Sequence, residues 1–355
     1  MEKIKIVGLQ KSYTNRKKES VVALYKCDLS VNPNEFLVLL GESGCGKTSL
    51  LKVIAGIESY DFGEIFFDGI PAEELDQIDK NMSYVPQNLV LFPNKTVFEN
   101  IMEPLEILKV PKKDRINRVK ELGDQLGLTI LLTRRPRELS GGQKQMVAIA
   151  RALAKEPAIC LFDEPLCNLD VIYHDEIIEF LLNTHKLTHA TYIYSTHNQK
   201  EAFRLADRVA IMHNRKIEQI DTPQNIIQNP KTLFVAKFLK DIFLFDIACS
   251  YSDGELINEN IGLKYKKKLN DYKENQTVNL VLKAKDIVVD KNGQFEADVI
   301  SGTEGFVTCS FLEQEFNLSL DSELVSEDKI RFNLRLDDAL IFVDGKNIDL
   351  EDENI

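Results

Sequence analysis

Residues 36–48, FLVLLGESGCGKT, combine residue types that bind phosphate. They match the pattern G-x-x-x-x-G-K-[ST], preceded by an apolar run typical of a buried strand and followed by a helical stretch. Glycines let backbone N–H groups close around a phosphate, and a helix start adds unpaired N–H groups and a positive dipole end. Lys47 would reach the β- and γ-phosphates, and the Thr48 hydroxyl would bind Mg²⁺. Spacing and flanks both favour a nucleoside triphosphate site over an ordinary glycine-rich turn.

A pair of acids, Asp163 and Glu164, follows a second apolar run at residues 158–162. Ligands gather at the carboxyl ends of strands in parallel α/β sheets. Asp163 suits Mg²⁺, usually through water, and Glu164 suits a general base for an attacking water. Paired acids after a strand are often only a polar strand end, but a phosphate loop in the same chain favours the functional interpretation.

Three other sites leave alternatives open. Residues 139–143, LSGGQ, precede a clear helix, so Ser140 is either an ordinary N-cap or part of a second anion site. His197 follows a strand at residues 191–195, where it would either cap the sheet or touch a γ-phosphate. Tyr13 lies before a charged turn and is either an exposed ring or the face on which an adenine stacks.

The elements that must position these residues alternate between strands and helices. Segments 4–9 and 21–31 predict a strand pair, and residues 82–87 predict a strand that ends in Gln87. A helix-rich block punctuated by prolines extends from residue 97 to about 154. This alternation predicts a mainly parallel, doubly wound sheet.

Composition narrows the function classes. The chain has 355 residues, enough for two or three domains, and a formal net charge of -12, from 56 acidic and 44 basic residues. This acidic net charge argues against a nucleic-acid partner bound by general attraction between basic side chains and the phosphate backbone. No apolar run approaches the ~20 residues that cross a bilayer, and the N-terminus lacks a signal-peptide pattern.

The six cysteines are not spaced as a metal knuckle or a redox pair, so we expect reduced packing residues. Cys45 differs because it lies inside the phosphate loop, where alkylation should block nucleotide binding.

The pattern changes past about residue 240. Short alternating segments at 277–282, 305–312, 330–336 and 339–343 predict strands of a small β-barrel. A basic run at 264–268 could bind nucleic acid, but we favour a solvated hairpin edge.

Taken in order, the motifs resemble those of an ABC-transporter ATPase over roughly residues 4–239. The matching residues are Gly41 to Thr48 (Walker A), Gln87 (Q-loop), Leu139 to Gln143 (signature), Phe162 to Pro165 (Walker B), Asn168 to Asp170 (D-loop) and His197 (H-loop). The resemblance implies an α/β P-loop ABC ATPase core at 1–239, with a helical subdomain at about 88–155. It also implies an all-β, OB-like regulatory domain at 240–355, as in importers of sugars, polyamines or iron.

The resemblance also implies the site residues, with ATP and Mg²⁺ as cofactors. The catalytic residues would be Glu164, His197, Lys47 and Gln87, and the metal would lie at Thr48, Gln87 and Asp163. The nucleotide would be bound by Tyr13, Gly41, Glu42, Ser43, Gly44, Cys45, Gly46, Lys47, Thr48, Ser49, Ser140, Gly141, Gly142, Gln143 and Asp170. In the family the LSGGQ residues close on the ATP of a second subunit, and the exchange is mutual.

The implied function is an energy-coupling ATPase of an importer on the cytoplasmic face of the membrane. Its partners would be an identical or paired ATPase subunit, two transmembrane permease subunits and, indirectly, an extracytoplasmic solute-binding protein, with no nucleic acid. Carbohydrate is the favoured solute, and polyamine or iron is the alternative. A soluble ABC protein acting on ribosomes or DNA is less favoured, because the chain has one Walker A motif and no heptad run.

Departures from the family pattern leave the phosphate and metal ligands in place. They are Glu42, Cys167, Asn198, Arg215 and Asp221, the last two standing where glycine is usual.

Overall fold

A computed structural model of the chain describes residues 2–14, 17–76, 80–88, 90–167, 171–239, 242–269, 272–273, 276–303, 306–319 and 328–348. The chain divides into two compact units, Met1–Pro223 and Gln224–Ile355. The boundary predicted from the sequence, between residues 239 and 240, stays a prediction.

The central sheet of the first unit ends at the phosphate loop. Its order is β10-β9-β3-β8-β7-β6, and all neighbours are parallel except β10, which is antiparallel to β9. The strands are β3 (Phe36–Gly41), β6 (Met82–Val85), β7 (Ile159–Asp163), β8 (Thr191–Thr196), β9 (Arg208–His213) and β10 (Lys216–Asp221). Both β3 and β7 are buried throughout, which explains their continuous apolar sequences. Because they are parallel, their carboxyl ends reach one edge.

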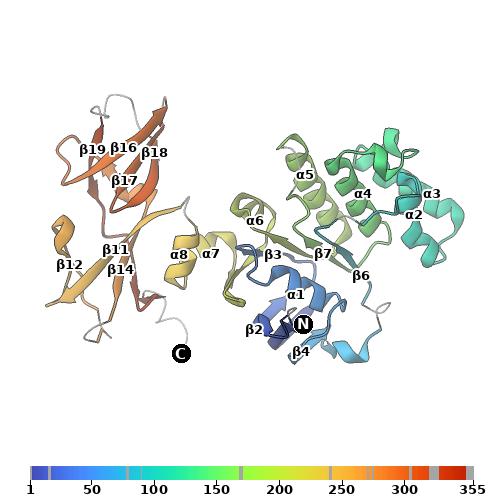
Figure 1. Cartoon of the computed structure of the whole chain (residues 1–355), viewed down its shortest axis with the longest axis horizontal. Helices are drawn as coiled ribbons and strands as arrows, with labels where there is room; N and C mark the ends of the chain where they lie inside the picture. The colour runs from blue at the N-terminus through green and yellow to red at the C-terminus, as the bar shows by residue number, and fades with distance from the viewer. Residues whose placement is uncertain are drawn as a thin grey trace. The chain divides into compact units, whose positions relative to one another are not determined.

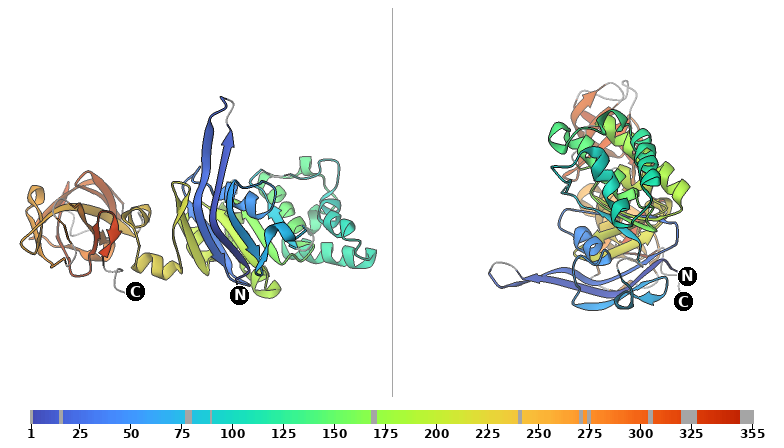
Figure 2. Two further views of the ribbon diagram at one scale, coloured as in Figure 1. Left: turned by 90° about the horizontal axis from the view of Figure 1, so that it is seen from below. Right: turned by 90° about the vertical axis from the view of Figure 1, so that its right-hand side faces the viewer.

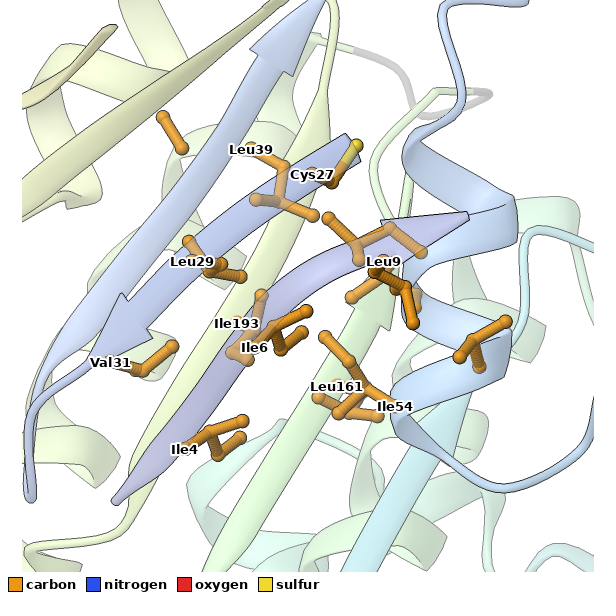
Figure 3. Close-up of a cluster of buried hydrophobic side chains, with 14 of the residues drawn as sticks. Ile4, Ile6, Leu9, Cys27, Leu29, Val31, Leu39, Ile54, Leu161 and Ile193 are labelled. Carbon is orange, nitrogen blue, oxygen red and sulfur yellow. The ribbon is translucent and has the colours of Figure 1, made fainter. Parts of the chain in front are cut away.

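A second, antiparallel sheet packs against the first in the order β2-β1-β4-β5. Its strands are β1 (Ile4–Thr14), β2 (Ser20–Val31), β4 (Phe62–Phe67) and β5 (Ile70–Pro71). β1 and β2 form the long hairpin seen in Figure 2. Figure 3 shows side chains of this hairpin meeting Leu39, Leu161 and Ile193 of the central sheet and Ile54 of the first helix. Each such buried side chain contributes about 1.5–3 kcal/mol, so the core holds the helix after the phosphate loop in place.

The helices of this unit are α1 (Lys47–Ile54), α2 (Val97–Ile107), α3 (Lys112–Gln125), α4 (Gly141–Leu153), α5 (Val171–Thr188) and α6 (Gln199–Leu205). Short 3₁₀ turns lie at Ala72–Glu74, Thr129–Leu131 and Pro136–Glu138. α2, α3 and α4 gather beyond β6 as a helical block (Figure 1). α2 begins where Thr96 accepts from the Glu99 N–H and Glu99 accepts from the Thr96 N–H, a capping box. No helix in the described part of the chain has the length and apolar character of a membrane span.

The second unit is built almost entirely of strands. They are β11 (Phe243–Ser252), β12 (Glu255–Asn258), β13 (Leu263–Lys266), β14 (Val278–Lys283), β15 (Ile287–Val289), β16 (Phe295–Thr303), β17 (Phe306–Phe311), β18 (Gln314–Ser319), β19 (Lys329–Leu334), β20 (Leu340–Val343) and β21 (Lys346–Asn347). Two short helices precede them, α7 (Pro223–Gln228) and α8 (Leu233–Phe238), and 3₁₀ turns lie at Glu259–Ile261 and Ala284–Asp286.

These strands form two antiparallel sheets, β13-β12-β11-β14-β20-β21 and β15-β19-β16-β17-β18, around one apolar core. The predicted fold class is therefore confirmed: an α/β core with a helical block, followed by an all-β region. The basic run starts in β13, at the edge of its sheet.

Candidate nucleotide site

The phosphate loop joins β3 to α1, and its backbone requires glycine. Gly46 has φ +114° and Gly44 has φ +80°, which L side chains rarely adopt. A β-carbon on Gly46 would lie 2.6 Å from the Ala23 carbonyl oxygen, and one on Gly41 would lie 2.5 Å from that of Met212. The loop is therefore packed between β2 and β9, and α1 begins at Gly46 without a side-chain cap.

A pocket of about 390 Å³ opens at this loop. It is lined by Tyr13, Val21, Val22, Ala23, Ser43, Gly44, Gly46, Lys47, Thr48, Ser49, Gln87, Glu164 and Arg215. Tyr13 is 36% exposed, and its hydroxyl hydrogen-bonds to Ser49 Oγ at 3.2 Å and to the Glu58 carboxylate. Lys11 Nζ lies 5.1 Å from the centroid of the Tyr13 ring.

The other predicted catalytic residues all contact the Glu164 carboxylate. Glu164 Oε1 lies 3.4 Å from Lys47 Nζ. Glu164 Oε2 accepts a hydrogen bond from Gln87 Nε2 at 3.3 Å and lies 3.5 Å from His197 Nδ1. The Glu164 side chain is only 12% exposed, so these contacts lie in a partly desolvated site where electrostatic interactions are stronger than in water.

Backbone hydrogen bonds hold the cluster in place. The Glu164 N–H donates to Ser195 O at 3.1 Å and Oγ at 3.0 Å, and Glu164 itself has φ +44°. Lys47 Nζ donates to the carbonyl oxygens of Gly41 at 2.8 Å and Glu42 at 3.0 Å. The lysine is 3% exposed, so its charge points into the loop rather than into solvent.

Asp163 organises a second, adjacent group of oxygen atoms. Its Oδ1 accepts from Thr48 Oγ1 at 3.0 Å and from Ser195 Oγ at 2.8 Å, and its Oδ2 accepts from the Tyr84 hydroxyl at 3.2 Å. Burial and the nearby Asp163 charge raise the pKa of the Tyr84 phenol, so the phenol stays a donor. Sequence reasoning missed Ser195 and Tyr84, because polar residues inside strands carry no motif.

The Thr48, Asp163 and Gln87 oxygen atoms fit a hard divalent cation. The described residues contain no group of three or more His, Cys, Asp or Glu side chains that could hold a metal. A hydroxyl and one carboxylate suit Mg²⁺ because this ion keeps waters and takes further oxygens from nucleotide phosphates.

The segment after His197 is fixed by residues that the motifs did not reveal. The Asn198 side chain caps α6 by accepting from the N–H groups of Lys200 at 2.9 Å and Glu201 at 3.3 Å. The buried Glu201 accepts from the hydroxyls of Tyr194 at 2.9 Å and Thr196 at 2.8 Å. Asn198 therefore supplies the cap that an aspartate would supply.

The LSGGQ residues lie elsewhere, at the start of α4. Ser140 Oγ accepts from the Gln143 N–H at 3.3 Å, and Gln143 Oε1 accepts from the Ser140 N–H at 3.1 Å. Neither they nor Gly141 and Gly142 line the Walker A pocket. Asp170, together with Asn168 and Leu169, lies outside the described residues.

A glycine-rich loop between a parallel strand and a helix, facing an acid pair at the end of another strand of the same sheet, defines a P-loop nucleoside triphosphatase. The family model described as ABC transporter matches residues 24–167. The import ATP-binding protein UgpC for sn-glycerol-3-phosphate from Bordetella avium is 39% identical over 261 residues, covering 72% of this chain and 70% of that protein. The trehalose/maltose import ATP-binding protein MalK of Thermococcus litoralis is 40% identical over 225 residues, covering 62% of this chain and 60% of that protein.

The spermidine/putrescine import protein PotA of Trichormus variabilis is 42% identical over 235 residues, covering 66% of this chain and 62% of that protein. This chain thus spans less than two thirds of PotA and MalK. Among solved structures, the dimeric post-hydrolysis ATP-binding cassette MJ0796, bound to ADP and Pi, aligns with a TM-score of 0.57 at 30% identity, covering 62% of this chain and 98% of that one.

The chain belongs to the ABC transporter family. The predictions of an ABC ATPase and of ATP binding are confirmed.

Proposed function

We propose that this chain couples ATP hydrolysis to solute import, working as a dimer docked on two permease subunits at the cytoplasmic face of the membrane. The convergence of Lys47, Gln87 and His197 on the Glu164 carboxylate supports this most directly. A non-hydrolysing cassette has no need to hold a carboxylate among these groups.

Each residue has a role in hydrolysis. Glu164 removes a proton from the attacking water, a contribution of typically 10²–10⁴-fold. Lys47 offsets charge that develops on the β- and γ-phosphates, and His197 orients the γ-phosphate. Thr48 and Asp163 would hold Mg²⁺, with Gln87 at the same position, and the ion would neutralise phosphate charge.

The second half of the pocket would come from a partner subunit. Ser140 to Gln143 lie at a helix start, where backbone N–H groups and the dipole favour an anion. Because they do not line the pocket of their own chain, we propose that they close on the ATP of the partner, together with Asp170. The dimeric state of the similar cassette MJ0796 supports this arrangement.

A groove beside the helical block offers a site for a permease segment. It has a volume of about 460 Å³ and lies between β6, α2 and α4, with Tyr84, Pro104, Ala148 and Arg151 among its lining. Val90 is 62% exposed and Ile107 is 73% exposed along it. Exposed apolar side chains in a groove favour the apolar face of a helix as the ligand. We therefore propose that a helix of a permease subunit docks here and couples the permease to this chain.

For the solute, we propose a carbohydrate or carbohydrate phosphate, delivered by an extracytoplasmic binding protein. UgpC and MalK, by their names, import sn-glycerol-3-phosphate and trehalose/maltose, whereas PotA imports polyamines. Transport of radiolabelled glycerol-3-phosphate, maltose and spermidine into cells with and without this chain distinguishes these solutes. Loss of spermidine uptake alone would contradict the carbohydrate proposal.

The catalytic proposal is tested with Glu164→Gln, which keeps size and most hydrogen bonds. We expect ATP binding to persist, turnover to fall at least 10²-fold, and a dimer to accumulate with ATP on size-exclusion chromatography with light scattering. Glu179→Gln, an exposed carboxylate on α5 outside the pocket, is the matched control. Normal turnover in Glu164→Gln would remove this residue from the general-base role.

A further inference from the structure

Arg215 occupies a backbone position that favours glycine. It lies in the turn between β9 and β10 with φ +68°, next to Asn214 with φ +45°. Asparagine tolerates this left-handed conformation because of its short polar side chain, but a long side chain does not share that advantage. A non-glycine residue held in such a conformation often has a functional reason.

The turn emerges beside the phosphate loop. Gly41 at the end of β3 pairs with Met212 in parallel β9, so the chain after each strand leaves the sheet at the same edge. The Arg215 carbonyl oxygen accepts from Tyr25 N at 2.9 Å and from Cys27 Sγ at 3.2 Å, which fastens the turn to β2. β2 in turn contacts the loop, since Ala23 O lies against Gly46.

Arg215 brings a second cation to the nucleotide pocket. The charged residues that line the pocket are Lys47, Glu164 and Arg215. Lys47 is already engaged by two carbonyl oxygens and by Glu164. Within the described residues, no hydrogen bond or ion pair engages the Arg215 guanidinium. A guanidinium offers several N–H donors in a planar fork that matches phosphate oxygens.

We propose that the Arg215 guanidinium binds the phosphate chain of the nucleotide and thereby raises the affinity of this subunit for ATP. This inference rests on the proposed function, because it takes ATP as the ligand of the pocket. The Arg215 side chain contributes to ATP binding, but it holds the backbone in a strained conformation. Replacing Arg215 by glycine should therefore lower the affinity for ATP and raise the stability of the fold.

The test measures ATP and adenosine affinity, by calorimetry, for the full chain and for Arg215→Gly and Arg215→Gln. A charge-assisted hydrogen bond corresponds to roughly tenfold or more in affinity, so ATP should bind about tenfold more weakly to both variants. Adenosine, which has no phosphate, should bind equally to all three. Arg215→Gly should also melt at a higher temperature than Arg215→Gln, because glycine relieves the left-handed backbone.

Two neighbours serve as matched controls. Asn214→Gly changes the same turn without touching the pocket lining, and Lys216→Gln removes one positive charge at the first residue of β10, directly after the turn. Both control variants should bind ATP with the affinity of the unmodified chain.

Unchanged ATP affinity in Arg215→Gly, or an equal loss in Lys216→Gln, would overturn the inference while leaving the proposed function intact. An equal loss of adenosine affinity would overturn the phosphate contact. Absence of ATP binding by the unmodified chain would instead overturn the proposed function, and this inference with it.

Discussion

Two helices of the first unit, α1 and α4, have glycines at their starts. The sequence predicts a phosphate site at α1, whereas at α4 it leaves open an ordinary N-cap or a second anion site. The two helices differ in whether a side chain caps their first N–H groups. α1 starts at Gly46 with no side-chain cap, and the buried Lys47 follows at once. α4 starts at the exposed Ser140, whose side chain and that of Gln143 form a capping box.

This difference shows that the two helix starts have different requirements. At α1, glycines and a buried lysine leave the helix start free to receive phosphate within the same chain. At α4, the capping box satisfies the N–H groups of Ser140 and Gln143, which stabilises the exposed helix start. We expect the other N–H groups of this helix start to bind a phosphate only when a second subunit brings ATP to them.

The largest effect should come from removing the charge at α1. In Lys47→Ala, ATP turnover should fall about 10²–10³-fold, because a buried cation no longer offsets phosphate charge. A coupled assay for phosphate release measures this. Lys52→Ala, on the same helix but paired with Glu58 outside the pocket lining, should keep normal turnover. Equal losses in both variants would mean that α1 is merely destabilised.

A smaller effect should come from the cap of α4. Ser140→Ala removes the cap, at a cost of about 1 kcal/mol of stability, and should also reduce turnover without weakening ATP binding to the monomer. Thr96→Ala removes the equivalent cap of α2. It should therefore lose about as much stability as Ser140→Ala, but it removes no proposed contact with ATP. Comparison of melting temperature, ATP affinity and turnover separates the two effects. If Thr96→Ala reduced turnover as much, the signature would have only a structural role.

The smallest effect concerns two thiols of the first unit, Cys45 in the phosphate loop and Cys167 after the acid pair. Burial raises the pKa of both the Cys45 and the Cys167 thiol, but Cys45 is only 8% exposed, whereas Cys167 is exposed. A raised pKa leaves less reactive thiolate at neutral pH. Because Cys167 is the exposed thiol, it should be alkylated first, and labelling of Cys45 should become faster as pH rises from neutral to alkaline.

ATP should slow the labelling of Cys45, and the modified loop should no longer bind nucleotide. Mass spectrometry of the labelled chain, with and without ATP, measures both. Rapid labelling of Cys45 at neutral pH in the presence of ATP would contradict its position in the loop.

The parallel core, the phosphate loop and the acid pair could all be predicted from the sequence. Continuous apolar runs specify strands buried on both faces, and the spacing of Gly41, Gly46 and Lys47 suits one backbone geometry around a phosphate. The alternating segments of the C-terminal region likewise specified strands, because a period of two is a local property.

Which side chains share the site depends on how the strands pair and pack. Ser195 and Tyr84 lie far along the chain from Lys47, and parallel pairing of β3, β8, β7 and β6 brings their strands to one edge. Arg215 enters the pocket because β9 pairs with β3 in a register that no local pattern records. Contacts between segments distant in sequence depend on register and packing, so they appear only once the sheet has formed.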